Sequence, residues 1–403
     1  MNDSSPRGSQ IYPGSPVEIL REFGSQPVSN RFPDQPGKEE FFQEMTLALC
    51  PRSGLVQLLR PFPADELRPR VPWLTVFEPE GHLDAMVAKL AELPGLTRDD
   101  IVAGYSSKDD TTLRRMSELG FRKQWRLDSA EDLGISDPCA FVETFQVPFV
   151  EGVARRAAEV RGRPKLFLVR HVLEHSYDLM GFLRAASDVV DEDGYVVFEV
   201  PDCTRALEEL DYTTLWEEHS VYFTPPTFRE ALRAVGLDPV FFEIYPHPFE
   251  NCMVAVCRKG SRTDDISAND LRVECDRARR FEREFPAITD RFRERLSQRK
   301  SAGHRLALFG AGHLASAFLC LHRLEEFFEF VVDDNPQKAG KFMAGTSLPI
   351  CGSSCLADES IAHCLLSLNP ESEEKVVAKN EAFLAAGGKF FSIFPSSSRY
   401  FFR

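Results

Sequence analysis

Apolar and polar positions along the middle of this chain alternate in short segments, with the period of a strand and then of a helix. From 82 to 93 the apolar residues recur at helical spacing and predict an amphipathic helix. Similar patterns predict strands over 100–104, 121–127, 166–169 and 195–200, and helices over 112–119, 149–160, 179–190 and 228–235. Such alternation is typical of a mostly parallel, doubly wound α/β sheet.

The segments before and after this region have other patterns. A short helical pattern covers Val17 to Phe23, and residues 46–59 predict two strands around a Pro-Arg-Ser-Gly turn. Residues 240–245 and 252–257 predict two closing strands arranged as a hairpin.

The last third of the chain predicts a charged amphipathic helix and a second α/β unit. The expected buried stripe of that helix is Leu271, Phe281, Phe285, Ile288, Phe292 and Leu296. After it come a strand over 306–309, a glycine-rich turn into a helix, a strand over 330–332 and a last strand in KFFSIFP. We therefore expect a second Rossmann-like α/β domain.

Composition narrows the class of protein. A chain of 403 residues is too long for one ordinary core. No apolar run approaches the roughly 20 residues that span a bilayer, and the N-terminus lacks the pattern of a secretory signal. Ten scattered cysteines favour a reduced, cytoplasmic compartment. The net charge of −14 argues against nucleic-acid and membrane partners, which leaves a small-molecule substrate.

A polar cluster follows the most apolar predicted strand. His171, Glu174 and His175 come directly after the run 166–169, where a strand ends at the carboxyl edge of an α/β sheet and ligands bind. The spacing also occurs in zinc sites on helices. Because the motif begins at a strand end, we favour a place at the cofactor and substrate cleft over a metal site. Ordinary polar residues at a strand–helix junction are the alternative.

A second cluster combines an acid, a base and aromatic rings. Glu218 and His219 lie beside Trp216 and Tyr222, and proton abstraction in a cleft requires such groups. The alternative is a solvated Glu-Glu-His cluster at the edge of a loop.

Two further stretches resemble nucleotide-binding turns. Gly104, with Asp109 or Asp110, ends the first predicted strand, and Asp128 ends the second, where an acid accepts hydrogen bonds from ribose hydroxyls. Farther along, Gly310 and Gly312 form a GxGxxA turn, and Asp333 follows at the distance of a dinucleotide-binding acid. A nicotinamide cofactor is therefore one alternative for the last domain.

Taken together, these motifs resemble one family, the S-adenosylmethionine (SAM)-dependent C-methyltransferases that act on keto-deoxysugar nucleotides. The resemblance rests on GSQPVSNRF, LCPRSGLVQL, RHVLEH, EVPD, WEEHSVYFTP, FGAGHLA and VVDDNPQKAGKFMAGTSLPI, in that order. It implies a degenerate zinc-binding-like domain at 1–80, a Rossmann-like methyltransferase domain at 81–260, a linker and helix at 261–300, and a Rossmann-like domain at 301–403.

The resemblance also implies roles for individual residues. His219 is the expected general base for methyl transfer to carbon of a keto-sugar nucleotide or related metabolite, with Glu218 beside it. The residues expected to bind SAM are Gly104, Asp109, Asp110, Asp128, Arg170 and His171, and those expected to bind substrate are His175, Trp216, Tyr222 and Asn251.

The chain departs from the family at several motifs. Near the usual Cys-x-x-Cys pairs only Cys50 remains, so we expect no zinc, which needs about four ligands. The cofactor loop reads GYSSKDDTTL in place of a Gly-Ser-Asn-Asp-Gly sequence, and PFEN at 248–251 replaces a Gly-Gly-Ser turn. Trp216 and Glu217 stand where tyrosine and histidine are usual.

These departures leave two alternatives to a methyltransferase. One is a protein that has lost SAM binding and only binds a sugar nucleotide. The other is a nicotinamide-dependent oxidoreductase that uses the C-terminal glycine turn. The expected assembly is a monomer or a homodimer.

Overall fold

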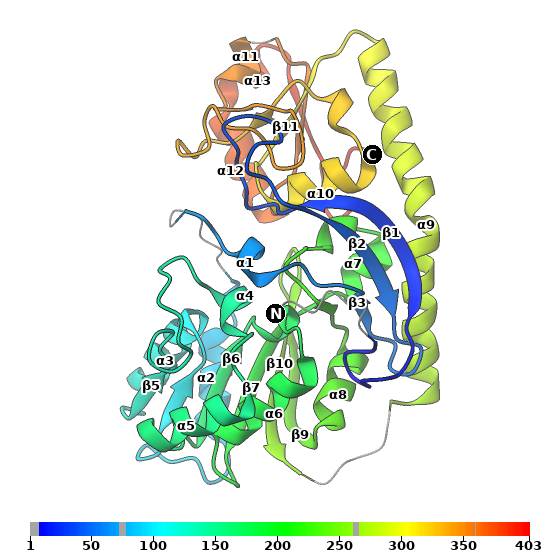
Figure 1. Cartoon of the computed structure of the whole chain (residues 1–403). Coiled ribbons are helices and arrows are strands. Elements are labelled where there is room, and N and C mark those ends of the chain that lie inside the picture. The colour runs from blue at the N-terminus through cyan, green and yellow to red at the C-terminus, as the bar shows by residue number, and fades with distance from the viewer. Residues whose placement is uncertain (1–7, 72–77, 261–265, 359) are drawn as a thin grey trace. The chain divides into compact units, whose positions relative to one another are not determined.

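The chain is described by a computed structural model that covers residues 8–71, 78–260, 266–358 and 360–403 (Figure 1). It divides into two compact units. The first comprises Met1–Ile19, Leu47–Thr204 and Glu218–Asp276, and the second comprises Leu20–Thr46, Arg205–Glu217 and Arg277–Arg403. Contacts do not show which segments fold alone, so the expected domain boundaries stay a prediction.

The first unit is built on a six-stranded sheet with the order β5-β4-β6-β7-β10-β9. Its strands are β4 (Val102–Gly104), β5 (Gln124–Arg126), β6 (Leu166–Arg170), β7 (Tyr195–Asp202), β9 (Leu237–Tyr245) and β10 (Asn251–Lys259). The first four in the sheet order are parallel, whereas β10 runs antiparallel to both β7 and β9. The expected mostly parallel sheet and closing hairpin are confirmed.

Helices cover both faces of this sheet, which explains why β6 and β7 are mostly apolar and are buried along their whole length. One face packs against α5 (Glu151–Arg161), α6 (Leu179–Val189) and α8 (Pro225–Ala234). The other packs against α2 (Leu83–Leu90) and α3 (Asp110–Glu118). Each large apolar side chain buried there contributes about 1.5–3 kcal/mol. All five predicted helices are confirmed.

A four-stranded sheet has the order β1-β2-β3-β8, with β1 (Glu18–Pro27), β2 (Phe42–Leu49), β3 (Val56–Leu58) and β8 (Val221–Tyr222). The strands predicted around the Pro-Arg-Ser-Gly turn are therefore confirmed. The helical pattern over Val17 to Phe23 was misleading, because these residues form most of β1. Gly24, with φ of 75°, has a backbone conformation that no right-handed helix contains.

The helix predicted after the linker is α9 (Ala268–Ser301). Of its expected stripe, Phe281, Phe285, Phe292 and Leu296 are buried, whereas Leu271 and Ile288 are only partly buried. No helix among the described residues is both long and apolar enough to cross a membrane.

The C-terminal sheet has the order β13-β12-β11-β14-β15, and every pair in it is parallel. Its strands are β11 (Leu306–Phe309), β12 (Val331–Val332), β13 (Ile350–Cys351), β14 (His363–Leu366) and β15 (Lys389–Ser392), with helices α10 (His313–His322) and α12 (Pro370–Lys379). The short helices of the chain are α1 (Ala64–Leu67), α4 (Val142–Phe145), α7 (Thr204–Glu209), α11 (Cys355–Asp358) and α13 (Glu381–Ala385). The expected second α/β domain is confirmed, although β13 and β14 were not predicted.

Candidate active site at the carboxyl edge of the first sheet

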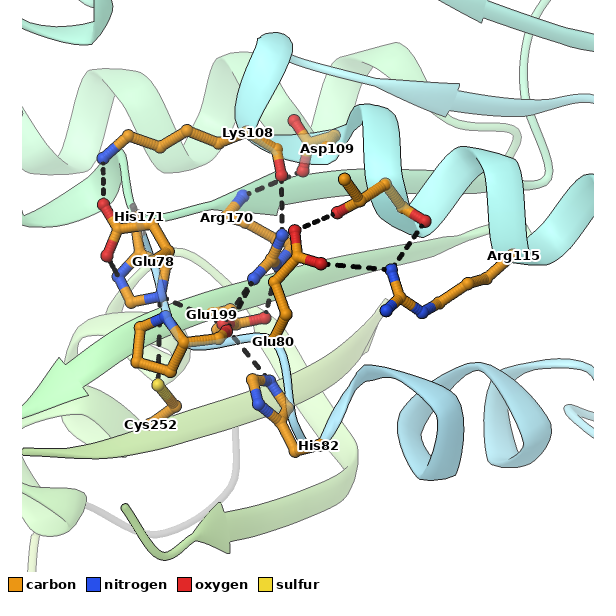
Figure 2. Close-up of polar contacts among 12 residues, drawn as sticks. Glu78, Glu80, His82, Lys108, Asp109, Arg115, Arg170, His171, Glu199 and Cys252 are labelled. Carbon is orange, nitrogen blue, oxygen red and sulfur yellow. Dashed lines mark hydrogen bonds and ion pairs between the residues drawn. The ribbon is translucent and has the colours of Figure 1, made fainter. Parts of the chain in front are cut away.

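The loop after β4 closes on the side chain of Asp109. This buried carboxylate accepts hydrogen bonds from the backbone N–H groups of Tyr105 at 3.0 Å, Ser106 at 2.9 Å and Arg170 at 3.1 Å. Burial raises the pKa of Asp109 to about 7. The carboxylate therefore shapes the loop and ties it to the end of β6 (Figure 2).

Gly104 allows this closure because it has no side chain. A Cβ added at Gly104 would lie only 2.9 Å from the Cβ of Asp109. The next acid, Asp110, is exposed and pairs with Arg126 at 2.8 Å. Of the two acids predicted to bind SAM, Asp109 is therefore buried inside the loop and Asp110 is exposed outside it.

A buried ion pair lies beneath the loop. The guanidinium of Arg170 donates to both oxygens of Glu199 on β7, at 2.7 and 3.1 Å, and to the carbonyl of Lys108 at 2.6 Å. Both partners are almost completely buried. Burial disfavours the charge of Glu199, but Arg170 and the hydrogen bond from His171 outweigh it and hold the pKa of Glu199 well below its usual range.

His171 extends this network to Glu78 and Glu174. Its backbone has φ of 49°, which is uncommon outside glycine. Its Nε2 lies 3.0 Å from Glu199, and its Nδ1 lies 3.5 Å from Glu78, which also pairs with Lys108 at 2.5 Å. Burial opposes the charge of His171, but Glu78 in particular raises its pKa well above the usual range. The carboxylates around His171 therefore favour its charged form.

Sequence reasoning missed two carboxylates of this network, Glu199 and Glu78. A charged residue inside the β-branched run of β7 was the available sign of Glu199, because a buried strand tolerates a carboxylate only with a partner. Glu78 comes from a loop far from β6 in the sequence, and no pattern in the sequence pointed to it.

A second group of side chains lies where the WEEH segment meets the turn after β6. Ser220 donates its N–H to the carbonyl of Glu174 at 2.8 Å, which ties the start of β8 to that turn. The rings of His175 and His219 meet edge to face, with centroids 4.8 Å apart, and Nδ1 of His175 lies 3.1 Å from the carbonyl of Glu218. Tyr222 lies beside them, its ring centroid 6.3 Å from that of His219.

The imidazole of His175 is held neutral. Burial, together with the neighbouring His219 and Lys108, lowers its pKa well below the usual range. We assign its Nδ1 as the donor to the carbonyl of Glu218, which leaves Nε2 as an acceptor.

Two buried carboxylates complete this region. Glu174 and Glu143 each have one oxygen without a hydrogen-bond partner among the described residues. Burial raises the pKa of Glu143 to about 7. Ligand atoms of Glu174, His175 and His219 lie within 4.8 Å of one another, as do those of Glu143, His175 and Glu218. This region thus contains two carboxylate oxygens, one each of Glu174 and Glu143, that have no hydrogen-bond donor among the described residues.

The other candidate residues are spread more widely. Asp128 is exposed after β5 and accepts the N–H groups of Ala130 and Glu131, which lower its pKa. Asn251 begins β10, and its Oδ1 accepts the N–H of His247 at 3.3 Å. Trp216 belongs to the second unit, where its ring stacks on His313 at 3.9 Å.

Cys50, the remaining cysteine near the family's zinc-binding motif, is buried at the end of β2. The expectation that no zinc is bound there stays a prediction.

The C-terminal glycine turn uses its own acid. Asp333 accepts the N–H of Ala311 at 3.0 Å and pairs with Lys338 at 2.9 Å. A nicotinamide dinucleotide would need the carboxylate of Asp333 to accept a hydrogen bond from its ribose. That carboxylate is already bonded to Ala311 and Lys338 within the protein.

Comparison with known proteins agrees with this architecture. Residues 60–240 match the family described as methyltransferase domain, and residues 267–395 match the C-methyltransferase C-terminal domain. The chain is also 24% identical over 389 residues to C-methyltransferase NovU of Streptomyces niveus, covering 91% of this chain and 90% of that protein.

Solved structures resemble only part of the chain. The 1,6-didemethyltoxoflavin-N1-methyltransferase of Burkholderia thailandensis is 16% identical and covers 45% of this chain and 78% of its own, with a TM-score of 0.30. A SAM-dependent methyltransferase of Aquifex aeolicus is 12% identical and covers 45% of this chain and 93% of its own, with a TM-score of 0.29. Scores this low carry no argument about function.

The family matches cover most of the first sheet and the C-terminal sheet, in the order found along the chain, and the similarity to NovU extends over nearly the whole chain. The chain therefore carries a methyltransferase domain followed by a C-methyltransferase C-terminal domain, and it is a SAM-dependent methyltransferase.

Proposed function

We propose that this protein methylates a carbon next to the keto group of a nucleotide-linked sugar, with His219 as the general base. The observation that carries the proposal is the position of His219 against His175, at the carboxyl edge of the first sheet. Ligands of open α/β sheets bind at this edge. The loop that begins after β4 reaches the same edge through the bond between Asp109 and Arg170.

The residues at this edge fit a cationic nucleoside donor. Asp128 is exposed at the end of the neighbouring strand, where an acid can accept bonds from ribose hydroxyls. The unpartnered oxygens of Glu174 and Glu143 need a donor, and a positively charged group would supply one. When bound, SAM supplies an electrophilic methyl group to a carbanion.

Proton removal from the sugar carbon is assigned to His219. A base in hydrogen-bond reach of the proton typically contributes about 10²–10⁴-fold in rate. His175 lies edge to face with His219, and its lowered pKa keeps it neutral, so it does not compete with His219 as the base. The positive charges of Lys108 and His171 both act on His175 and are suited to stabilise an enolate oxygen beside it.

Isothermal titration calorimetry with S-adenosylhomocysteine and with NADH tests the choice of cofactor. We expect micromolar binding of S-adenosylhomocysteine and no binding of NADH. Binding of neither ligand by folded protein would favour a protein that only binds a sugar nucleotide, and binding of NADH alone would favour an oxidoreductase.

A His219→Gln variant tests the base. Incubating a keto-deoxysugar nucleotide in deuterium oxide should exchange the proton next to the ketone with wild-type protein, and about 10²-fold more slowly with the variant. The variant should keep its affinity for S-adenosylhomocysteine, and His304→Gln in the second unit serves as the matched control. Full exchange and turnover by His219→Gln would remove the assignment.

The nature of the acceptor is tested with paired substrates. A keto-sugar nucleotide should gain a methyl group on carbon, as seen by NMR of the product, whereas the corresponding alcohol should not react. Methylation of an oxygen atom, or equal reaction of ketone and alcohol, would contradict enolate chemistry.

A further inference from the structure

Three side chains that the proposed reaction does not use converge beside Glu199. They are His82 at the start of α2, His247 in the loop after β9, and Cys252 in β10, all within the first unit. One ligand atom from each lies within 4.8 Å of the others. His247 and Cys252 lie close together in sequence at the turn between β9 and β10, whereas His82 is distant in sequence and is brought to them by the fold.

The spacing of the two imidazoles matches a shared metal ion. Nδ1 of His82 lies 3.2 Å from Nε2 of His247. Two nitrogens bound to one tetrahedral zinc ion, each at about 2.0–2.1 Å, are separated by roughly 3.3 Å. A direct hydrogen bond between the rings gives a similar distance, so further evidence must decide between the two.

The surroundings of His82 supply that evidence. Its Nε2 lies 3.3 Å from Oε1 of Glu199, yet this buried nitrogen has no aligned hydrogen bond among the described residues. Metal-bound histidines usually direct their second nitrogen to a carboxylate, which fixes the tautomer. With Nε2–H directed to Glu199, the lone pair of Nδ1 points to the side where His247 lies.

Cys252 supplies the third ligand. One ligand atom each of Cys252, His82 and His247 lies within 4.8 Å of the others. Imidazole and thiolate ligands select zinc over magnesium and calcium, which prefer oxygen.

We infer that His82, His247 and Cys252 form a zinc site, with a fourth position for water and with Glu199 orienting His82. This site is separate from the Cys-x-x-Cys pairs that the family uses near Cys50. Glu199 also binds Arg170, whose guanidinium contacts the loop after β4. The metal would therefore also stabilise this loop.

Metal content of the full-length protein tests this inference without any assay of methyl transfer. Plasma mass spectrometry of protein purified with zinc in the medium should find one zinc ion per chain. Cobalt substitution should give a thiolate-to-cobalt absorption band. Cys252→Ala and His82→Gln should each lower the affinity for zinc by at least tenfold.

Cys257→Ala is the matched control, because Cys257 is buried on the same strand outside this cluster, and it should keep the zinc. If Cys252→Ala does not fold, His247→Gln in the adjoining loop replaces it. A wild-type protein without zinc, or zinc retained by Cys252→Ala and His82→Gln, would overturn the inference.

Discussion

The two α/β sheets of this protein both place a strand, a tight turn and a helix around a buried or half-buried aspartate, but the surroundings differ. In the first sheet Asp109 closes the loop after β4 and bonds to the end of β6, where Arg170, Glu199 and His171 form a charged network. In the C-terminal sheet Asp333 closes the turn after β11 and pairs with Lys338. A shared folding motif therefore does not determine the chemistry at its edge.

The histidines of the two units show the same contrast. His171 lies among carboxylates that raise its pKa and favour its charged form. His322 stacks on Phe285 at 4.9 Å and bonds to Thr289 at 2.7 Å, and burial lowers its pKa to about 3. Two buried histidines of this protein thus have opposite pKa shifts, because only His171 lies among carboxylates.

The largest expected effect on stability comes from removing the carboxylate beneath the cofactor loop. Glu199→Leu leaves Arg170 buried without its partner and should lower the free energy of unfolding by about 3–5 kcal/mol, measured by urea denaturation. Asp333→Asn, at the partly buried pair with Lys338, should cost only about 1 kcal/mol. Equal losses of unfolding free energy in Glu199→Leu and Asp333→Asn would contradict this difference between the two ion pairs.

The next effect concerns acid stability. The pKa of His322 in the folded chain is about 3, below its unfolded value of 6.5, so its stabilising contribution is present above pH 6.5 and is lost as the pH falls toward 3. Between these limits the loss is about 1.4 kcal/mol per pH unit. His322→Gln should therefore weaken the drop in unfolding free energy between pH 7 and pH 5 by about 2 kcal/mol.

Urea denaturation of wild type and variant at both pH values measures this difference. His304→Gln, a half-buried histidine of the same unit, is the control. An identical pH dependence in wild type and His322→Gln would contradict a neutral buried imidazole.

The smallest effect distinguishes the exposed acids near the cofactor loop. Asp128→Asn should weaken S-adenosylhomocysteine binding about tenfold, or about 1.4 kcal/mol, because it loses a charged acceptor for ribose. Asp110→Asn should leave affinity unchanged, since Asp110 pairs with Arg126 on the surface. Calorimetry with both variants makes the comparison, and equal affinities would exclude the proposed role of Asp128.

The elements that the sequence predicted well are those with local patterns. The buried runs of β6 and β7 and the amphipathic α6 follow directly from residue periodicity. The helix predicted over Val17 to Phe23 was wrong because a non-local effect prevailed. The apolar spacing of this segment suits a helix, but its pairing in a sheet makes it part of β1. Strands as short as β13, with two residues, carry too little pattern to be recognised.

The candidate site was predictable where its residues are close in sequence. His171 and His175, like Glu218 and His219, could be grouped from their spacing alone. The partners Glu78, His82 and Glu143 come from separate loops and helices, and only the tertiary fold brings them near. Arg170 and Asp109 were expected to bind SAM. In the structure Asp109 accepts the backbone N–H of Arg170, and the guanidinium of Arg170 donates to Glu199 and to the carbonyl of Lys108, contacts that a motif does not reveal.

The most direct test of the account is a crystal structure of the protein with S-adenosylhomocysteine bound. We predict that the sulfur atom lies above the carboxyl ends of β4 and β6, with the imidazole of His219 facing it across the space for the sugar carbon. A sulfur atom bound elsewhere, or an imidazole directed away from it, would contradict the assignment of His219 as the base.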